Sequence, residues 1–171
     1  PEVVTSIIEE LESKFGKMKV CRGREHNFLG MNLKYNEDGT VNINMEQYIN
    51  EAIEESRLDV AKPAKTPAGS DLFEIDPGAA PLDKEKSKIF HSVTAKLLYV
   101  SKRGRPDIQL AVAFLCTRAT KSTTQDWNKL HRLLRYANET NDLNFKIGAD
   151  SMEEIRTWID ASYATHPDMK S

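Results

Sequence analysis

Residues 28–56 read FLGMNLKYNEDGTVNINMEQYINEAIEES and decide how this part of the chain folds. Two short apolar runs flank Asp38-Gly39, and glycine accepts a positive φ angle without steric cost, so this pair predicts a tight hairpin turn. In residues 41–45 apolar and polar residues alternate, which predicts a strand with one buried face. A helical pattern follows from residue 46 to residue 56. The stretch therefore predicts a β-hairpin that leads directly into a helix.

The periodicity of apolar residues predicts helices on both sides of this stretch. Residues 1–15 carry apolar side chains at helical spacing, and residues 17–22 suit a short strand. Thr123 to Asp126 resembles a capping box with Asp in place of Glu or Gln. Three further helices are predicted over residues 85–101, 106–118 and 123–138, and two strands at 144–147 and 155–161. The sequence therefore predicts an α+β fold.

Residues 61–85 differ in composition from the segments around them. They hold four of the seven prolines and two glycines: Pro63, Pro67, Pro77, Pro81, Gly69 and Gly78. This composition is typical of a linker or of an ordered loop that lies over a surface. We expect the segment to contribute no part of a domain core.

Length and composition limit the classes of protein to which this chain can belong. The 171 residues suit one domain or two small ones, and 39% of them are hydrophobic. No apolar run is long enough to cross a bilayer and no signal-peptide pattern occurs, so we expect a soluble intracellular protein. Cys21 and Cys116 lie far apart without a Cys-x-x-Cys spacing, which favours two buried thiols over a disulfide or a metal site.

The net charge of −2 conceals an uneven distribution of charge. Residues 96–135 contain nine basic residues and two acidic ones, Asp107 and Asp126, which gives this stretch a net charge of +7. A basic stretch inside an acidic chain favours a surface that contacts phosphate, although a solvated helical face has the same pattern. The nine basic residues are Lys96, Lys102, Arg103, Arg105, Arg118, Lys121, Lys129, Arg132 and Arg135.

Several segments together resemble the reverse transcriptase of copia-type LTR retrotransposons. Each is weak alone, but their order and spacing over nearly the whole chain make the resemblance specific. They are Phe28-Leu29-Gly30-Met31, Met45-Glu46-Gln47-Tyr48-Ile49, Lys62-Pro63-Ala64-Lys65-Thr66-Pro67, Leu97-Leu98-Tyr99-Val100, Arg105-Pro106-Asp107-Ile108, Trp127 with Leu133-Leu134-Arg135-Tyr136, and Trp158-Ile159-Asp160-Ala161-Ser162. The resemblance implies a parent polyprotein that copies RNA into DNA.

The resemblance also implies which part of the polyprotein this chain represents. The family's polymerase centre binds two metal ions through paired aspartates of a Tyr-x-Asp-Asp hairpin and a third carboxylate. No Asp-Asp pair occurs in this sequence, so we expect a fragment that begins just after that hairpin and lacks polymerase activity alone. Mg²⁺ or Mn²⁺ would serve the complete parent enzyme, and no cofactor is expected for the fragment.

The implied division of the chain has four parts. Residues 1–60 would form the C-terminal part of the palm with a primer-grip hairpin, and residues 61–85 would form a Pro/Gly-rich linker. Residues 86–139 would form a helical thumb. Residues 140–171 would form a connection and the first strands of a truncated ribonuclease H-like sheet.

Two sets of candidate residues for nucleic-acid binding follow. Phe28, Leu29, Gly30 and Met31 resemble the primer grip, where glycine lets the backbone approach nucleic acid, although an ordinary hairpin with Phe28 and Met31 in the core fits equally well. Trp127 could stack on a base, but its spacing is more typical of a core residue. The basic thumb residues that suit a sugar-phosphate track are Arg105, Arg118, Lys121, Lys129, Arg132 and Arg135.

Asp160 is the candidate at the other end of the chain. Its position on a predicted strand resembles that of the first catalytic, metal-binding aspartate of the family's ribonuclease H domain. Asp168 does not match the next carboxylate of the family, so Asp160 would belong to an incomplete site. An aspartate at the end of a strand is otherwise a cap or turn residue.

The expected function is that of a fragment of an RNA-directed DNA polymerase with ribonuclease H. Its partners would be an RNA template and a DNA primer or RNA–DNA hybrid, together with the rest of the polyprotein and no membrane, in a cytoplasmic particle or the nucleus. One alternative is a non-catalytic nucleic-acid-binding protein or a domesticated remnant. Another is an α+β interaction module whose basic stretch is merely solvated.

Overall fold

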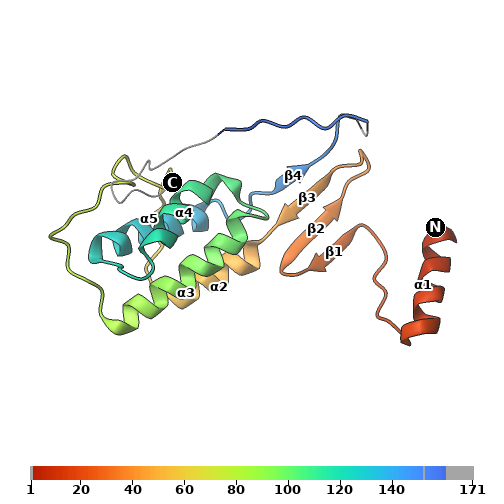
Figure 1. Ribbon diagram of the computed structural model, residues 1–171, viewed down its shortest axis with the longest axis horizontal. Helices are drawn as coiled ribbons and strands as arrows, with labels where there is room; N and C mark the ends of the chain where they lie inside the picture. Colours follow the sequence, from red (N-terminus) through yellow and green to blue (C-terminus); the bar gives the residue numbers. More distant parts are fainter. Residues whose placement is uncertain (1, 152, 161–171) are drawn as a thin grey trace.

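A computed structural model describes residues 2–151 and 153–160 and shows a small sheet between an N-terminal helix and a body of packed helices (Figure 1). In chain order the elements are α1 (Glu2–Phe15), β1 (Glu25–Phe28), β2 (Met31–Tyr35), β3 (Val41–Asn44), α2 (Glu46–Ser56), α3 (Lys84–Ser101), the 3₁₀ helix η1 (Pro106–Ile108), α4 (Gln109–Arg118), α5 (Thr124–Glu139) and β4 (Phe145–Ile147). The predicted α+β fold class is therefore confirmed.

Two hairpins build most of the sheet, whose strands are antiparallel in the order β1-β2-β3-β4. The predicted turn at Asp38-Gly39 joins β2 to β3, and Gly39 has a φ angle of 80°. A second turn joins β1 to β2 through Leu29 and Gly30, whose φ angles are 51° and 76°. Positive φ at both central residues matches the right-handed twist of the two strands. The sequence predicts the Asp38-Gly39 turn but not this one, because Leu29-Gly30 lacks the Asn-Gly or Asp-Gly pair that is typical of such turns.

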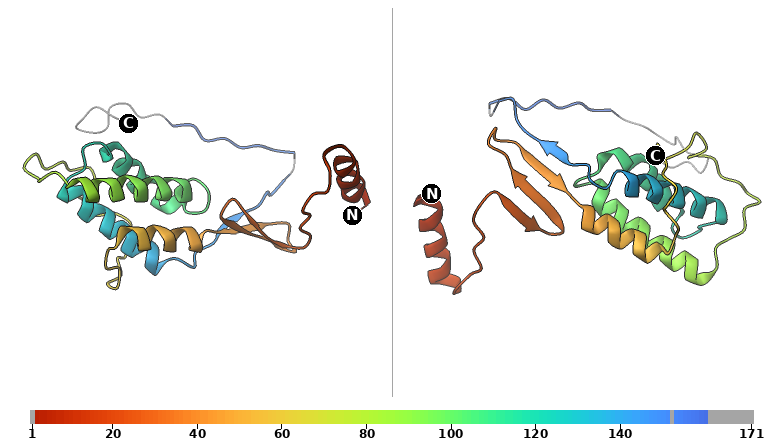
Figure 2. Two further views of the ribbon diagram at one scale, coloured as in Figure 1. Left: turned by 90° about the horizontal axis from the view of Figure 1, so that it is seen from below. Right: turned by 180° about the vertical axis from the view of Figure 1, so that it is seen from behind.

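The sheet is joined to the helical body at two points. β3 leads directly into α2, and β4 follows α5 and pairs with β3, so that Ile43 lies opposite Phe145. Figure 2 shows both connections at the same end of the helical body. Because β3 and β4 are antiparallel, both connections lie at the same end of the β3–β4 pair, and this end fixes the sheet to the helices.

Two predicted strands are absent. Residues 17–22 have no regular structure, and neither do residues 155–160, where Ile155, Trp158 and Ile159 are 95%, 86% and 90% exposed. Residue 161 lies outside the described residues. A strand needs a neighbour for its backbone hydrogen bonds. Within the described residues, the edge strands of the sheet are β1 and β4, and neither of them pairs with residues 17–22 or 155–160. The prediction of a strand is therefore wrong for residues 155–160, while the ribonuclease H-like assignment of residues 140–171 stays a prediction.

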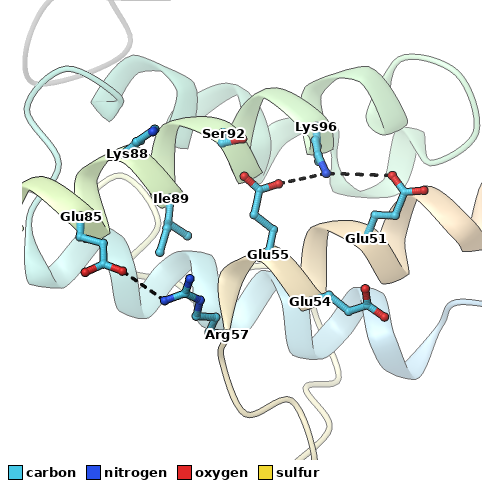
Figure 3. Close-up of a pocket in the computed structure, with 9 residues that line it drawn as sticks. All are labelled: Glu51, Glu54, Glu55, Arg57, Glu85, Lys88, Ile89, Ser92 and Lys96. Atoms are coloured by element: carbon cyan, nitrogen blue, oxygen red, sulfur yellow. Dashed lines mark hydrogen bonds and ion pairs between the residues drawn. The ribbon is translucent and has the colours of Figure 1, made fainter.

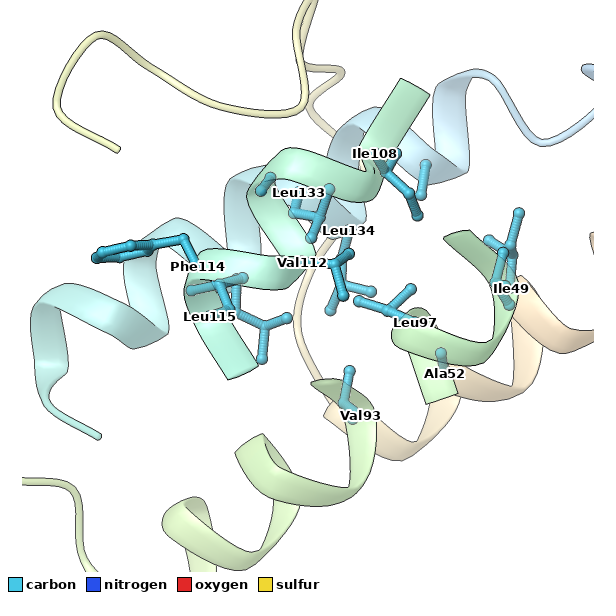
Figure 4. Packing of buried hydrophobic residues seen from close by; sticks show 14 of the residues in the cluster. Ile49, Ala52, Val93, Leu97, Ile108, Val112, Phe114, Leu115, Leu133 and Leu134 are labelled. Carbon is cyan, nitrogen blue, oxygen red and sulfur yellow. The ribbon is translucent and has the colours of Figure 1, made fainter. Parts of the chain in front are cut away.

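The hydrophobic core lies among α2, α3, α4 and α5 (Figure 4). Leu97, Val112 and Leu134 are completely buried there. α2, which the expected division groups with the palm, packs against α3 and α5. The loop between α2 and α3 also contributes, because Leu72 is 5% exposed and belongs to the same cluster. The expectation that residues 61–85 add nothing to a core is therefore wrong at Leu72.

α1 stands apart from the sheet and the helical body (Figures 1 and 2). It forms at the predicted place, but none of its residues is buried, and Val3 and Phe15 are 72% and 77% exposed. Cys21 and Cys116 are free thiols, but Cys21 is exposed, so the prediction that both are buried is wrong there. Among residues 2–151 and 153–160, no helix is both long and apolar enough to span a membrane.

The carboxylate of Asp38 ties the β2–β3 turn to β4. It accepts hydrogen bonds from the Thr40 backbone N–H at 3.0 Å, from the Thr40 hydroxyl at 2.5 Å and from Lys146 Nζ at 3.1 Å. These bonds, with that of the Thr40 hydroxyl first, lower the pKa of Asp38 from 3.8 to about 2. Because the folded pKa lies below the unfolded one, Asp38 stabilises the turn above about pH 4 and loses this effect as the pH falls toward 2.

We therefore expect the Thr40 amide signal to titrate with a midpoint near pH 2 in a proton–nitrogen NMR experiment. The Asp38→Asn chain should show no such transition, because its side chain carries no proton that titrates in this range. A wild-type midpoint at the ordinary value of 3.8 would contradict the hydrogen-bonded turn.

Candidate nucleic-acid interface

The Leu29–Gly30 turn docks against two tyrosines of the helical body. Tyr99 on α3 donates a hydrogen bond from its hydroxyl to the backbone carbonyl of Leu29, with an O···O distance of 2.7 Å. Tyr48 on α2 stacks on Tyr99, with ring centroids 5.1 Å apart. A side chain 70 residues further along the chain thus fixes the backbone of the turn. We call residues 28–31 the anchored turn.

Gly30 is required by this docking as well as by the turn. Its φ angle of 76° suits glycine, and a Cβ atom at this position would lie 2.7 Å from Cδ2 and Cε2 of Tyr48. Such a distance is far inside van der Waals contact, so no other side chain fits without a shift of the ring. The close backbone approach that the sequence suggested for nucleic acid is made here to Tyr48.

The side chains of the anchored turn divide between the core and the solvent. Met31 is partly buried and packs against the core, whereas Phe28 and Leu29 are 56% and 63% exposed. The alternative that Phe28 and Met31 both fill the core is therefore wrong for Phe28. Exposed apolar side chains on a fixed backbone suit contact with the faces of bases and sugars.

A cationic side chain lies beside the anchored turn. The guanidinium of Arg103 lies 3.7 Å above the ring of Tyr99, and its Nη1 donates to the Tyr99 carbonyl at 3.3 Å. Lys102 next to it is exposed. A guanidinium that is already stacked loses little freedom when it binds a phosphate. The turn thus presents apolar side chains and positive charge within one region.

Sequence reasoning did not select three residues of this region, namely Tyr48, Tyr99 and Arg103. Tyr48 belongs to the apolar stripe of the helix predicted over residues 46–56, and Arg103 is one of the nine basic residues in residues 96–135. Tyrosines at the edge of such a stripe are the signal to look for, because they bury a ring and keep a hydroxyl for a partner.

Arg105 and Arg118 lie inside the protein. Arg105 is 2% exposed, and its Nε and Nη2 donate to the two carboxylate oxygens of Asp107 at 2.9 and 2.8 Å. Arg118 is 5% exposed and pairs with Asp126, with an Nε–Oδ1 distance of 3.2 Å. Both guanidinium groups join elements of the helical body, and neither is presented to solvent.

Lys129 is also buried, at 9% exposure. Its Nζ donates to the backbone carbonyl of Glu74 at 2.5 Å and lies 4.8 Å from the ring centroid of Phe114. Burial lowers the pKa of Lys129, since a charged amine is costly to remove from water. Three of the six predicted phosphate ligands, Arg105, Arg118 and Lys129, thus have structural partners.

Arg132, Arg135 and Lys121 remain at or near the surface. Arg132 Nη2 donates to Thr66 Oγ1 at 2.8 Å, and Arg135 donates to the backbone carbonyls of Lys62 and Pro63. These bonds attach residues 59–76, which we call the strap, to one side of α5. Trp127 on the same helix is partly buried and packs against the core, as its spacing predicts.

Asp160 is exposed near the end of the described residues and lies outside any strand. Across residues 2–151 and 153–160, no three His, Cys, Asp or Glu side chains come together as a group that could hold a metal ion. Asp168 falls outside the described residues. A metal-binding role for Asp160 therefore stays a prediction.

The hollow between α2 and α3 has a volume of about 650 Å³ and charged walls (Figure 3). Lys96 pairs with Glu55 at 3.0 Å, and Arg57 pairs with Glu85 at 3.1 Å. The hydrogen bond that Lys96 donates to Glu55 raises the pKa of Lys96. These pairs join α2 and the adjoining Arg57 to α3, so these charges hold the two helices together; Glu54 and Lys88 also line the hollow.

The chain is similar along nearly its whole length to two longer proteins. A putative transposon Ty5-1 protein of Saccharomyces cerevisiae is 27% identical over 171 residues, which cover 99% of this chain and 54% of that protein. An uncharacterized mitochondrial protein of Arabidopsis thaliana is 25% identical over 162 residues, which cover 95% of this chain and 65% of that protein. No family model and no solved structure matches the chain. The chain thus spans about half to two thirds of the relatives that it resembles.

Proposed function

We propose that this chain derives from a retrotransposon polyprotein and is the part of an RNA-directed DNA polymerase that positions primer and template. The similarity to a transposon Ty5-1 protein over 99% of the chain supports the retrotransposon origin. The ordered motifs that resemble copia-type reverse transcriptases support the finer assignment. The observation that carries the positioning role is the anchored turn, whose backbone is fixed by Tyr99 while Phe28 and Leu29 face solvent.

The geometry suits the positioning of a strand end. Nucleotidyl transfer requires the primer hydroxyl to be held within a fraction of an ångström, and a turn bound to packed helices moves less than a free hairpin. Phe28 and Leu29 would contact sugar and base faces. Arg103 uses Nη1 for the Tyr99 carbonyl and keeps further N–H donors for a phosphate oxygen.

The metal ions of the reaction would be bound elsewhere. In the complete parent enzyme, Mg²⁺ or Mn²⁺ would activate the primer hydroxyl on carboxylates that the rest of the polyprotein supplies. Asp160 would take part in ribonuclease H chemistry only together with further carboxylates. A non-catalytic nucleic-acid-binding remnant of such an element would use the same anchored turn, in a cytoplasmic particle or the nucleus.

Titration of the full chain with a primer–template RNA–DNA hybrid tests the proposal. We expect binding that weakens with salt, and quenching of a fluorescent base analogue at the primer 3′ end. Tyr99→Phe removes only the hydroxyl that holds Leu29, so it should reduce this quenching while total binding changes little. Tyr35→Phe is the matched control, since Tyr35 is 46% exposed and lies outside the anchored turn.

Two results would contradict the proposal. One is the absence of salt-dependent binding to the hybrid. The other is equal quenching at the primer end in the Tyr99→Phe and Tyr35→Phe chains, because the turn would then have no part in placing that end.

A further inference from the structure

We infer that the strap contributes its own lysines to nucleic-acid binding, so that Lys62 and Lys65 contact backbone phosphates beside Arg132 and Arg135. We call these four residues the strap patch. The inference rests on the proposed function, because it assigns a second surface of the chain to the same hybrid.

A series of hydrogen bonds holds the strap in place along α5. His131 bonds to the Asp59 carbonyl at 2.5 Å, and Gln125 Oε1 accepts from the Asp76 N–H at 3.0 Å. Between these ends, Arg132 and Arg135 bind Thr66 and the carbonyls of Lys62 and Pro63. The backbone on which both lysines stand is therefore fixed against α5.

Ala64 is the one buried residue in the middle of an exposed run of the strap, residues 61–66. Ala64 is 7% exposed and faces inward, whereas Lys62 and Lys65 on either side are exposed. Within the described residues, neither lysine takes part in an ion pair or donates a side-chain hydrogen bond. Both ammonium groups are thus available to an anion.

The charge of the strap patch is not compensated by the bonds that hold it. Arg132 and Arg135 donate to a hydroxyl and to two carbonyls, all neutral, and each guanidinium has five N–H donors, so donors remain on both. Residues 61–70 contain both lysines and no acidic residue. The acids of the strap lie on either side of this run, Asp59 before it and Asp71, Glu74 and Asp76 after it.

Four cations, two on the strap and two on the adjoining helix α5, suit a partner with repeated negative charge. A nucleic-acid backbone has one phosphate per nucleotide, and contacts with it are independent of sequence and sensitive to salt. Lysine ammonium groups bind phosphate as point charges and need no exact orientation, so long exposed side chains suffice. The strap thereby extends the basic track that the resemblance implies for the thumb and to which Arg132 and Arg135 belong.

The lysines provide a cleaner test than the arginines. Substitution of Arg132 or Arg135 removes charge and also releases the strap, so a loss of binding would have two causes. Lys62→Ala/Lys65→Ala removes two charges and breaks no hydrogen bond of the fold. Lys84→Ala/Lys86→Ala removes the same charge from exposed side chains in the first turn of α3 and is the matched control.

The experiment is an anisotropy titration of the full chain with a labelled RNA–DNA hybrid at four KCl concentrations. For Lys62→Ala/Lys65→Ala, we expect weaker binding and a slope of log K against log salt that is smaller by about 2, one for each phosphate that a lysine no longer neutralises. The Lys84→Ala/Lys86→Ala slope should equal that of the wild type. Thermal unfolding midpoints of all three chains should agree.

Equal slopes for wild type and Lys62→Ala/Lys65→Ala would overturn the strap patch and leave the proposed function in place. Equal decreases in both double variants would also overturn it, since the effect would then be one of net charge alone. A wild-type chain that does not bind the hybrid would overturn both the strap patch and the proposed function.

Discussion

Replacement of Asp126 by alanine is expected to lower the free energy of unfolding by about 3–5 kcal/mol, because it leaves a buried guanidinium without its carboxylate. Arg118 is 5% exposed and Asp126 is 1% exposed, so water does not replace the missing partner. The same carboxylate accepts from the Thr123 N–H at 2.9 Å and the Thr123 hydroxyl at 3.0 Å, which start α5. Urea unfolding at neutral pH measures the change.

A second variant separates the buried charge from the helix cap. Arg118→Met/Asp126→Ala removes the unpaired charge as well, so we expect it to be more stable than Asp126→Ala. Its free energy of unfolding should lie below that of the wild type mainly by the loss of the helix cap, about 1 kcal/mol. The account of the pair would be wrong if Asp126→Ala cost less than about 1 kcal/mol or if the double variant were no more stable than the single one.

Gly30→Ala is expected to cost about 3 kcal/mol, from the positive φ angle and from overlap with a packed ring. The new Cβ atom would lie 2.7 Å from the Tyr48 ring, which is itself held by its stack on Tyr99. Gly39→Ala is the matched control, because Gly39 also has a positive φ, of 80°, and nothing lies within 4 Å of its Cβ position. It should cost about 1–2 kcal/mol, the effect of the φ angle alone.

Urea unfolding of both variants, with amide exchange of the β1–β2 hairpin, measures the difference. We expect faster exchange throughout β1 and β2 in the Gly30→Ala chain, since the turn can no longer dock. Equal decreases of stability in the two variants would show that contact with Tyr48 contributes nothing to the position of the turn.

Local rules predicted much of the fold. The capping box is present as expected, with Thr123 and Asp126 bonded to each other's backbone N–H groups. The Asp38-Gly39 turn and the helices α1 to α5 also follow from neighbouring residues. Residues 17–22 and 155–160 have strand-like patterns and form no strands, because a strand depends on a partner that a local pattern does not reveal.

The candidate site was less predictable for the same reason. A count of charges does not show which ones are paired inside the fold, although Asp107 lies two residues after Arg105 and Asp126 eight after Arg118. The anchored turn depends on Tyr99, which is distant in sequence. The resemblance therefore indicates residues 28–31, whereas the contact that holds them is visible only in the fold.

The central claim is that the anchored turn lies at the end of a primer strand, and site-specific photo-cross-linking tests it most directly. A hybrid with a photoreactive base at the primer 3′ terminus is bound to the full chain and irradiated, and the linked peptide is identified by mass spectrometry. We predict linkage to residues 28–31, and its disappearance in the Gly30→Ala chain. Linkage confined to α1 or to the hollow between α2 and α3 would contradict the account.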